Sequence, residues 1–325
     1  MAKSEGRTEE PRSGWLNRGV GGIGLASLLA DLGHEVPTSL LPSLLTSVLG
    51  APAAALGLIE GFADGAAGLA RFGGGALSDD PARRRRVAVG GYSLTAILSS
   101  LIGLAFAVWQ VAVLRVGAWV ARGIRAPARN ALLADVVPGE AYGRAYGFER
   151  AMDNLGAIGG PLLALGLVAM VGVRSAIVIS VIPGILAAVA ILYAIRNAPR
   201  LKPREPRPLR IVVRPVLRGR LGRLMLAACA FEAGNAAATL LILRATGLLE
   251  PGRGHEGATQ LALLLYAAYN VAATLTSLLA GRIGDRRGNV PVLAAGAAFF
   301  LLAYLGFAVS GGVLWLAAAF VLAGV

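Results

Sequence analysis

The sequence predicts an all-α membrane protein, a helical bundle with a six-span N-terminal half and an incomplete C-terminal half. Only 15% of its 325 residues are charged, whereas soluble domains carry about 25%. Apolar residues form stretches of about 20, the length that a helix needs to cross a bilayer. Basic residues concentrate between these stretches, as in the loops of membrane proteins.

We identify nine such stretches and part of a tenth. Their residues do not alternate between apolar and polar, so we expect helices rather than the strands of a barrel. The last stretch is short, and a plan of six plus six spans would need its remainder and two further spans. We therefore expect a fragment truncated after about ten spans. The predicted spans are residues 20–47, 51–72, 87–107, 109–133, 143–172, 174–195, 224–248, 257–280, 290–309 and 312–325.

Four segments follow from this pattern of spans. They are an N-terminal tail (1–19), an N-terminal six-helix bundle (20–195), a basic linker (196–223) and a partial C-terminal bundle of about four spans (224–325). If the tail and the linker are cytoplasmic, all but four of the 31 Lys and Arg residues fall on the cytoplasmic side. We therefore expect a multi-pass protein of the cytoplasmic (inner) membrane with a cytoplasmic N-terminus. The net charge of +13 then reflects topology, which excludes nucleic acid as a partner.

Two short loops repeat one pattern after the second span of each half, and such internal repeats are typical of secondary transporters. A glycine lets the helix ends approach closely, and an aspartate four residues later can accept charge-assisted hydrogen bonds from nearby arginines. Such contacts can hold one access state closed. For the arginines of the first loop, anchoring of the topology is the alternative. The residues of these gating loops are Gly75, Asp79, Arg83, Arg84, Gly281, Asp285, Arg286 and Gly288.

These loops resemble the loop signature of the major facilitator superfamily. The second loop fits well, while the first departs from the signature at Asp80 and Ala82. In the fourth span, Arg115 followed by Arg122-Gly123 resembles the intramembrane arginine motif of that family. The resemblance extends from about residue 20 to the end, and it implies a major facilitator-type helical bundle and a transporter.

In the fifth predicted span, Gly156, Gly160 and Pro161 resemble a motif of the drug/proton antiporters in this family. Two glycines four residues apart share one helix face and permit tight packing, and a proline can kink the span. Ordinary close packing of helices accounts for the same pattern equally well, and both interpretations stay open.

Ionisable side chains inside the spans are candidates for a substrate cavity and a proton path, because unpaired charge is costly in hydrocarbon. Asp31, His34 and Glu35 share one face of the first span, with Asp31 near the midplane. We expect Asp31 and Glu35 to carry protons and Arg115 to be their counter-charge. The alternative is a static ion-pair network that joins the spans. Further candidates for the cavity are Glu60, Asp153 and Glu232.

The predicted function is proton-coupled export of a small lipophilic or cationic molecule by alternating access. We expect a monomer surrounded by lipid, with no cofactor and with the proton gradient as its energy source. The alternatives are a proton-coupled importer, a divalent-metal exporter that uses Asp31, His34 and Glu35, and a membrane scaffold that does not transport. The sequence contains no motif of a metalloprotease, serine hydrolase or phosphate-binding loop, so we do not expect an enzyme.

Overall fold

The structure is a computed structural model that describes residues 15–198 and, with short gaps, residues 219–325. The gaps are 220–221, 224–225, 227–228, 232–233, 288 and 310–311. The N-terminal tail up to residue 14 and linker residues 199–218 lie outside the described part. Within it, the chain forms helices joined by short turns, and no strand is present among the described residues.

Six helices form the first half of the fold. The side chain of Asn17 caps the start of the first helix by accepting from the backbone N–H of Val20 at 3.0 Å. Asp80 caps the third helix in the same way, and Pro81 occupies its first position. A π-helical turn (Leu44–Val48) extends the first helix. The helices are α1 (Arg18–Ser43), α2 (Ala53–Ser78), α3 (Pro81–Leu101), α4 (Val108–Asp135), α5 (Tyr142–Ile179) and α6 (Val181–Arg196).

In the second half, the continuous described helices are α8 (Ala238–Arg287), α9 (Asn289–Val309) and α10 (Val313–Gly324). Two long helices contain a corner at a glycine in the left-handed region, which side chains rarely adopt. Gly172 (φ 78°) breaks α5, where the sequence predicted the boundary between two spans. Gly254 (φ 69°) breaks α8.

The predicted span 224–248 differs from the structure, because residues 234–237 are not helical. The backbone N–H of Ala236 donates to the hydroxyl of Tyr304 on α9 at 2.5 Å. The bilayer core offers no water, so a backbone N–H that has no partner within a helix needs a hydrogen bond with another part of the protein. Non-helical residues therefore precede α8, and a side chain of α9 supports them.

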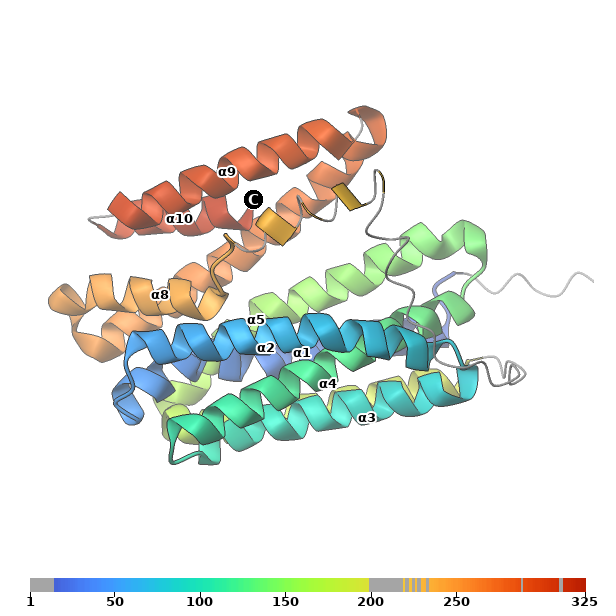
Figure 1. The fold of residues 1–325 in the computed structure, drawn as a ribbon, viewed down its shortest axis with the longest axis horizontal. Helices are drawn as coiled ribbons and strands as arrows, with labels where there is room; N and C mark the ends of the chain where they lie inside the picture. Colours follow the sequence, from blue (N-terminus) through green and yellow to red (C-terminus); the bar gives the residue numbers. More distant parts are fainter. Residues whose placement is uncertain are drawn as a thin grey trace, which may run out of the picture.

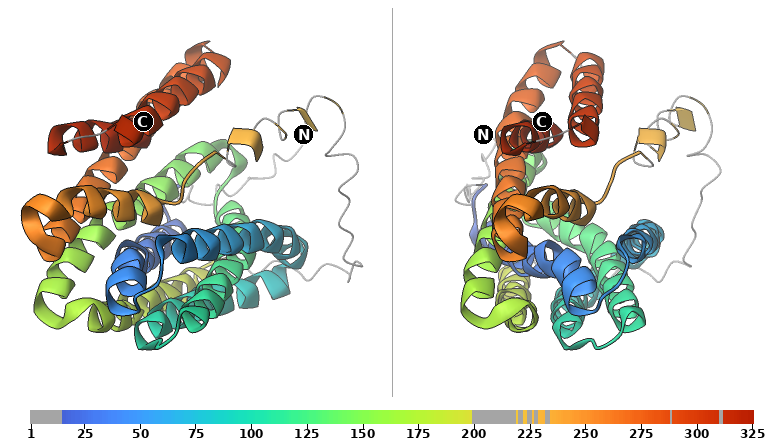
Figure 2. Two further views of the ribbon diagram at one scale, coloured as in Figure 1. Left: turned by 60° about the vertical axis from the view of Figure 1, so that its left-hand side comes forward. Right: turned by 90° about the vertical axis from the view of Figure 1, so that its left-hand side faces the viewer.

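The six helices of the first half lie together, and α8 runs between this bundle and the pair formed by α9 and α10 (Figure 1). The further views show the same separation (Figure 2). Helix α1 packs against α5 and α6, while α2 and α3 pack against α4. Helix α8 contacts α1 and α5 on one side and α10 on the other, so it carries the contact between the halves.

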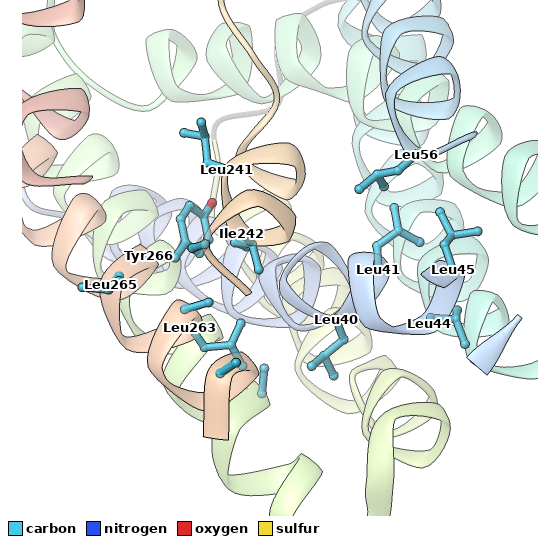
Figure 3. Packing of buried hydrophobic residues seen from close by; sticks show 14 of the residues in the cluster. Leu40, Leu41, Leu44, Leu45, Leu56, Leu241, Ile242, Leu263, Leu265 and Tyr266 are labelled. Atoms are coloured by element: carbon cyan, nitrogen blue, oxygen red, sulfur yellow. The ribbon is translucent and has the colours of Figure 1, made fainter. Parts of the chain in front are cut away.

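Buried leucines join the halves at the end of the bundle where α1 turns into α2 (Figure 3). Leu40, Leu41 and Leu44 of this end are fully buried, and they belong to one cluster with Ile242 and Leu263 of α8. Lipid is as apolar as leucine, so this burial contributes packing rather than a large hydrophobic gain. The cluster excludes water from between the halves at this end.

Glycines allow the closest helix crossings in the first half. A Cβ added at Gly123 of α4 would collide with the backbone of α2, and one added at Gly74 of α2 would collide with the backbone of α4. The sequence assigned this close approach to Gly75, but a Cβ there would meet nothing within 4 Å. The prediction was off by one residue, because one position along a helix rotates a side chain by about 100°.

Five described segments are long and apolar enough to cross a membrane. The long helices α1 and α4 fall outside this set, and they carry most of the buried charges described below. The five segments are Ala53–Ser78, Pro81–Leu104, Tyr142–Arg196, Ala238–Thr276 and Pro291–Val309.

Candidate functional site: a buried charge network

Arg115 of α4 is buried against α2, where it forms an ion pair with Glu60. The Nη2 atom of Arg115 lies 2.9 Å from Oε1 of Glu60, and the two side chains are 1% and 3% exposed. Nη1 of Arg115 also donates to the hydroxyl of Thr38 on α1 at 3.2 Å. The guanidinium lies 3.4 Å from the ring centroid of Trp119, close enough for a cation–π interaction.

Arg115 therefore forms its ion pair with Glu60 and not with Asp31 or Glu35, whose counter-charge the sequence predicted it to be. Glu60 is the eighth residue of α2 and Arg115 the eighth of α4. These neighbouring helices begin at the same end of the bundle, so the two side chains lie at the same depth. Asp31 lies near the middle of α1. It is paired with Arg122, which follows Arg115 on α4 by two helical turns.

Arg122 and Asp31 form the second buried ion pair, between α4 and α1. Nη2 of Arg122 lies 3.2 Å from Oδ1 of Asp31. Asp31 is 7% exposed in its side chain, but that of Arg122 is 33% exposed. The carboxylate is thus enclosed, while the side chain that carries its counter-charge is partly exposed.

Trp119 lies between the two ion pairs and orders the polar groups around it. Its indole N–H donates to Oδ1 of Asp64 on α2 at 2.7 Å. Its ring lies 4.4 Å from the imidazole of His34, centroid to centroid. One aromatic side chain thereby contacts Arg115, Asp64 and His34 on three helices.

Glu35 connects the two halves of the protein. The hydroxyl of Tyr266 on α8 donates to Oε2 of Glu35 at 3.0 Å, and both residues are buried. No ion pair of Glu35 with a described residue accompanies this hydrogen bond. A buried carboxyl group therefore lies at the contact between the halves, held by a neutral donor.

The glycines of α5 pack directly on the part of α1 that carries these carboxylates. A Cβ at Gly156 would collide with the backbone of Leu28 and approach Cβ of Asp31. A Cβ at Gly160 would collide with the side chain of Glu35. The tight packing predicted for this face is present, and Pro161 beside it is buried. A movement of α5 would therefore displace both carboxylates.

A third cluster joins α1, α4 and α5 towards the other end of the bundle. Nη1 of Arg129 lies 2.7 Å from Oε1 of Glu149 and 3.4 Å from Oδ1 of Asp153. The hydroxyl of Ser27 donates to the same Oε1 of Glu149 at 2.7 Å. Arg150, two-thirds exposed, pairs with Asp153 at 3.1 Å. With several mutual partners, this cluster fits the static network that the sequence offered as an alternative.

The first gating loop makes contacts that the sequence did not specify. Arg84 pairs with Asp135 at the end of α4, and its Nε donates to the carbonyl of Ser78 at 2.8 Å. Arg83 pairs with Asp80 at 3.4 Å. Asp79 is exposed and forms no ion pair with a residue in the described part. The contact between this loop and α4 therefore depends on Arg84 rather than on Asp79.

Several predicted site residues cannot be placed. Glu232 and Gly288 lie outside the described residues. Gly281, Asp285 and Arg286 lie in α8, where the structure describes only their backbone. The second gating loop stays a prediction.

Asp31, His34 and Glu35 do not converge, although they share one side of α1. Asp31 contacts α4, Glu35 contacts α8, and His34 contacts the ring of Trp119. The described side chains contain no group of three His, Cys, Asp or Glu residues suited to a metal ion. The arrangement instead provides separate carboxyl groups, one paired with a guanidinium and one with a phenol.

The sequence model described as Major Facilitator Superfamily matches residues 23–325. The chain belongs to the major facilitator superfamily. An uncharacterized protein of Mycobacterium tuberculosis is 30% identical over 298 residues, which cover 87% of this chain and 69% of that protein. An uncharacterized MFS-type transporter of Methanocaldococcus jannaschii is 28% identical over 303 residues, which cover 90% and 73%.

Solved structures of transporters share the superfamily fold. A bacterial homologue of the human lysosomal transporter Spinster, in an inward-facing and occupied conformation, aligns with a TM-score of 0.65 and 17% identity. The alignment covers 94% of this chain and 71% of that one. A POT family transporter in complex with 5-aminolevulinic acid aligns with a TM-score of 0.67 and 13% identity, covering 94% and 80%. At these identities the likeness shows the fold alone. The protein is an integral multi-pass membrane protein and a secondary transporter, not an enzyme.

Within this superfamily fold, sequence reasoning missed three side chains of the network. Trp119 and Tyr266 are aromatic residues in apolar spans, which usually indicate packing. Arg129 was counted only among the basic residues that set the topology. A signal was available for Arg122 and Arg129. Together with Arg115 they form a series of arginines spaced seven residues apart. That spacing keeps them on one face of α4.

Proposed function

We propose that this secondary transporter exports a small lipophilic or cationic molecule in exchange for protons. The observation that carries the proposal is the hydrogen bond between Glu35 and Tyr266. Alternating access requires contacts between the two halves to form and break. A carboxyl group at such a contact changes its charge when it binds a proton, so protonation and the access state become linked.

The pair of Asp31 and Arg122 supports the same mechanism. Asp31 is enclosed, and the side chain of Arg122 is one-third exposed. A proton that reaches Asp31 would neutralise the carboxylate and release Arg122. A cationic substrate would compete with the proton for the same carboxylate, which gives exchange rather than cotransport. The glycines of α5 make Asp31 and Glu35 move together, because both pack on them.

In the orientation that we propose, the N-terminus is cytoplasmic and the protein lies in the inner membrane as a monomer. The leucine cluster then closes the outer end between α1 and α8. The loop with Arg84 and Asp135 then faces the cytoplasm, where its positive charge agrees with the distribution of basic residues.

Proteoliposomes with an imposed pH gradient test this function. Ethidium serves as the cationic probe, and a dye trapped in the lumen reports the luminal pH. Adding ethidium should drive proton movement in the wild type. That movement should fall to the level of protein-free liposomes in Glu35→Gln and Asp31→Asn. Glu256→Gln, which removes an exposed carboxylate next to Gly257, is the matched control and should behave as the wild type.

Proton movement that persists in both carboxyl variants would contradict the proposed coupling. Ethidium uptake in the same direction as the protons would indicate an importer. Transport of zinc or manganese that is lost in His34→Ala would instead indicate a metal exporter. If no substrate moves protons, the scaffold alternative gains support.

A further inference from the structure

A small cavity lies between α1, α3, α4 and α6, separate from the two ion pairs. The centre of a water molecule can occupy about 10 Å³ of it, which is close to the minimum that holds one molecule of that size. His34 of α1, Tyr92 and Ser99 of α3, and Arg125 of α4 line the cavity. The space is too small for a polyatomic ligand such as phosphate.

Three polar atoms around this cavity lack a hydrogen-bond partner in the described structure. They are Nδ1 of His34, the hydroxyl of Tyr92 and the hydroxyl of Ser99. These residues are 4%, 1% and 2% exposed. A buried polar group without a partner costs about 1–3 kcal/mol, so three around one space indicate an occupant.

Arg125 supplies the charge that identifies the occupant. It is 3% exposed, yet it forms neither an ion pair nor a hydrogen bond with a described residue. Its guanidinium lies 4.0 Å from the ring centroid of Tyr92. The other arginines on this side of α4 have carboxylates, since Arg122 pairs with Asp31 and Arg129 with Glu149. Arg125 is therefore buried without a directly paired carboxylate in the described structure, and Asp31 of α1, which is already paired with Arg122, acts on it only from a distance.

The side chains that line the cavity favour an anion over a cation. No Asp or Glu is among the described residues that line it. Thr95 and Ser180, which also line it, donate to carbonyl groups of their own helices at 2.7 Å. The unpartnered hydroxyls of Tyr92 and Ser99 are free to donate into the space. His34 can do the same when its proton is on Nδ1.

We propose that this cavity is a binding site for a monatomic anion of the halide class, with Arg125 as its counter-charge. A water molecule could satisfy the three unpartnered atoms, but it would leave Arg125 without an anion in direct contact in a low-dielectric region. A halide satisfies the same donors and neutralises that charge. The bound anion would link α1, α3 and α4 within the first half, independently of whatever the central site transports.

Thermal unfolding in detergent tests this proposal. The protein is titrated with sodium chloride against sodium gluconate at constant ionic strength, because gluconate is too large for the cavity. Chloride should raise the apparent Tm of the wild type by about 2–4 °C. Arg125→Gln, Ser99→Ala and Tyr92→Phe should reduce or abolish that rise. Arg86→Gln, which removes an exposed arginine on α3, should keep it and controls for surface binding of anions.

A crystal grown in sodium bromide provides a second measurement. An anomalous peak between Arg125 and Ser99 is expected, and the peak should be absent in the Arg125→Gln variant. The Ser99→Ala and Tyr92→Phe variants keep the proposal testable if Arg125→Gln does not fold. A rise in Tm that is equal in the wild type and all variants would overturn the proposal. Electron density for a water molecule without an anomalous signal would overturn it too.

Discussion

Replacing Glu60 by Gln tests whether the buried pair with Arg115 stabilises the fold. The substitution preserves the shape of the side chain and removes its charge. Arg115 is then left 1% exposed and without an ion pair, because Glu60 is its only partner of that kind among the described residues. Removing one partner of a buried ion pair costs about 3–5 kcal/mol. Arg115 keeps the ring of Trp119 at 3.4 Å and the hydroxyl of Thr38 at 3.2 Å, so the lower value, about 3 kcal/mol, applies.

That loss corresponds to a fall in apparent Tm of roughly 6–12 °C, measured by thermal unfolding in detergent. The partner variant, Arg115→Gln, leaves the carboxylate of Glu60 buried without its charge partner, so its apparent Tm should fall as well.

A double-mutant cycle completes the measurement. The double variant, with Gln at both positions, buries no charge at this site, so it should recover part of the loss seen in Glu60→Gln. If Glu60→Gln lowers the apparent Tm by less than about 2 °C, the reasoning is refuted. So would a double variant that is less stable than both single variants, because that would mean the two charges act separately.

Three further changes have clear expected outcomes. Gly160→Ala should lower the apparent Tm by the equivalent of about 1–3 kcal/mol, because the added Cβ would collide with Glu35 of α1. The control Gly61→Ala should not lower the apparent Tm, because a Cβ there would meet nothing within 4 Å. Ser47→Ala removes the 2.8 Å hydrogen bond to His255 between the halves, so a cysteine introduced at this exposed end in a Cys229→Ala background should react with a maleimide about twice as fast. Asp135→Asn should make trypsin cleave the loop between α2 and α3 about two to five times faster, because it weakens an ion pair.

The helices could be predicted from the sequence because hydropathy and glycine act locally. The predicted boundary after residue 172 coincides with the positive φ of Gly172, and the glycines of the fifth span pack as a tight face. The exception is the non-helical stretch 234–237. Its irregularity depends on the hydroxyl of Tyr304 from another helix, which no local pattern reveals.

The pairing of charges could not be predicted, because it depends on which helices are neighbours and at what depth. The sequence places Asp31 and Arg115 in the membrane but does not align them. Their actual partners, Arg122 and Glu60, follow only once α2 and α4 are known to begin at the same end. The halide cavity was also beyond sequence reasoning, since Arg125 is distinguished from its neighbours only by lacking a carboxylate.

The distance along the chain between Asp31 and Arg122 has a consequence for how the protein is made. The two residues are 91 positions apart, and ribosomes add about 5–20 residues each second. Helix α1 therefore exists for about 5–18 s before its counter-charge has been synthesised. Inserting a lone aspartate at the centre of a helix costs about 2.5–3.5 kcal/mol at the translocon. We expect α1 to wait beside the translocon, with Asp31 protonated or hydrated, and to enter the lipid together with α4.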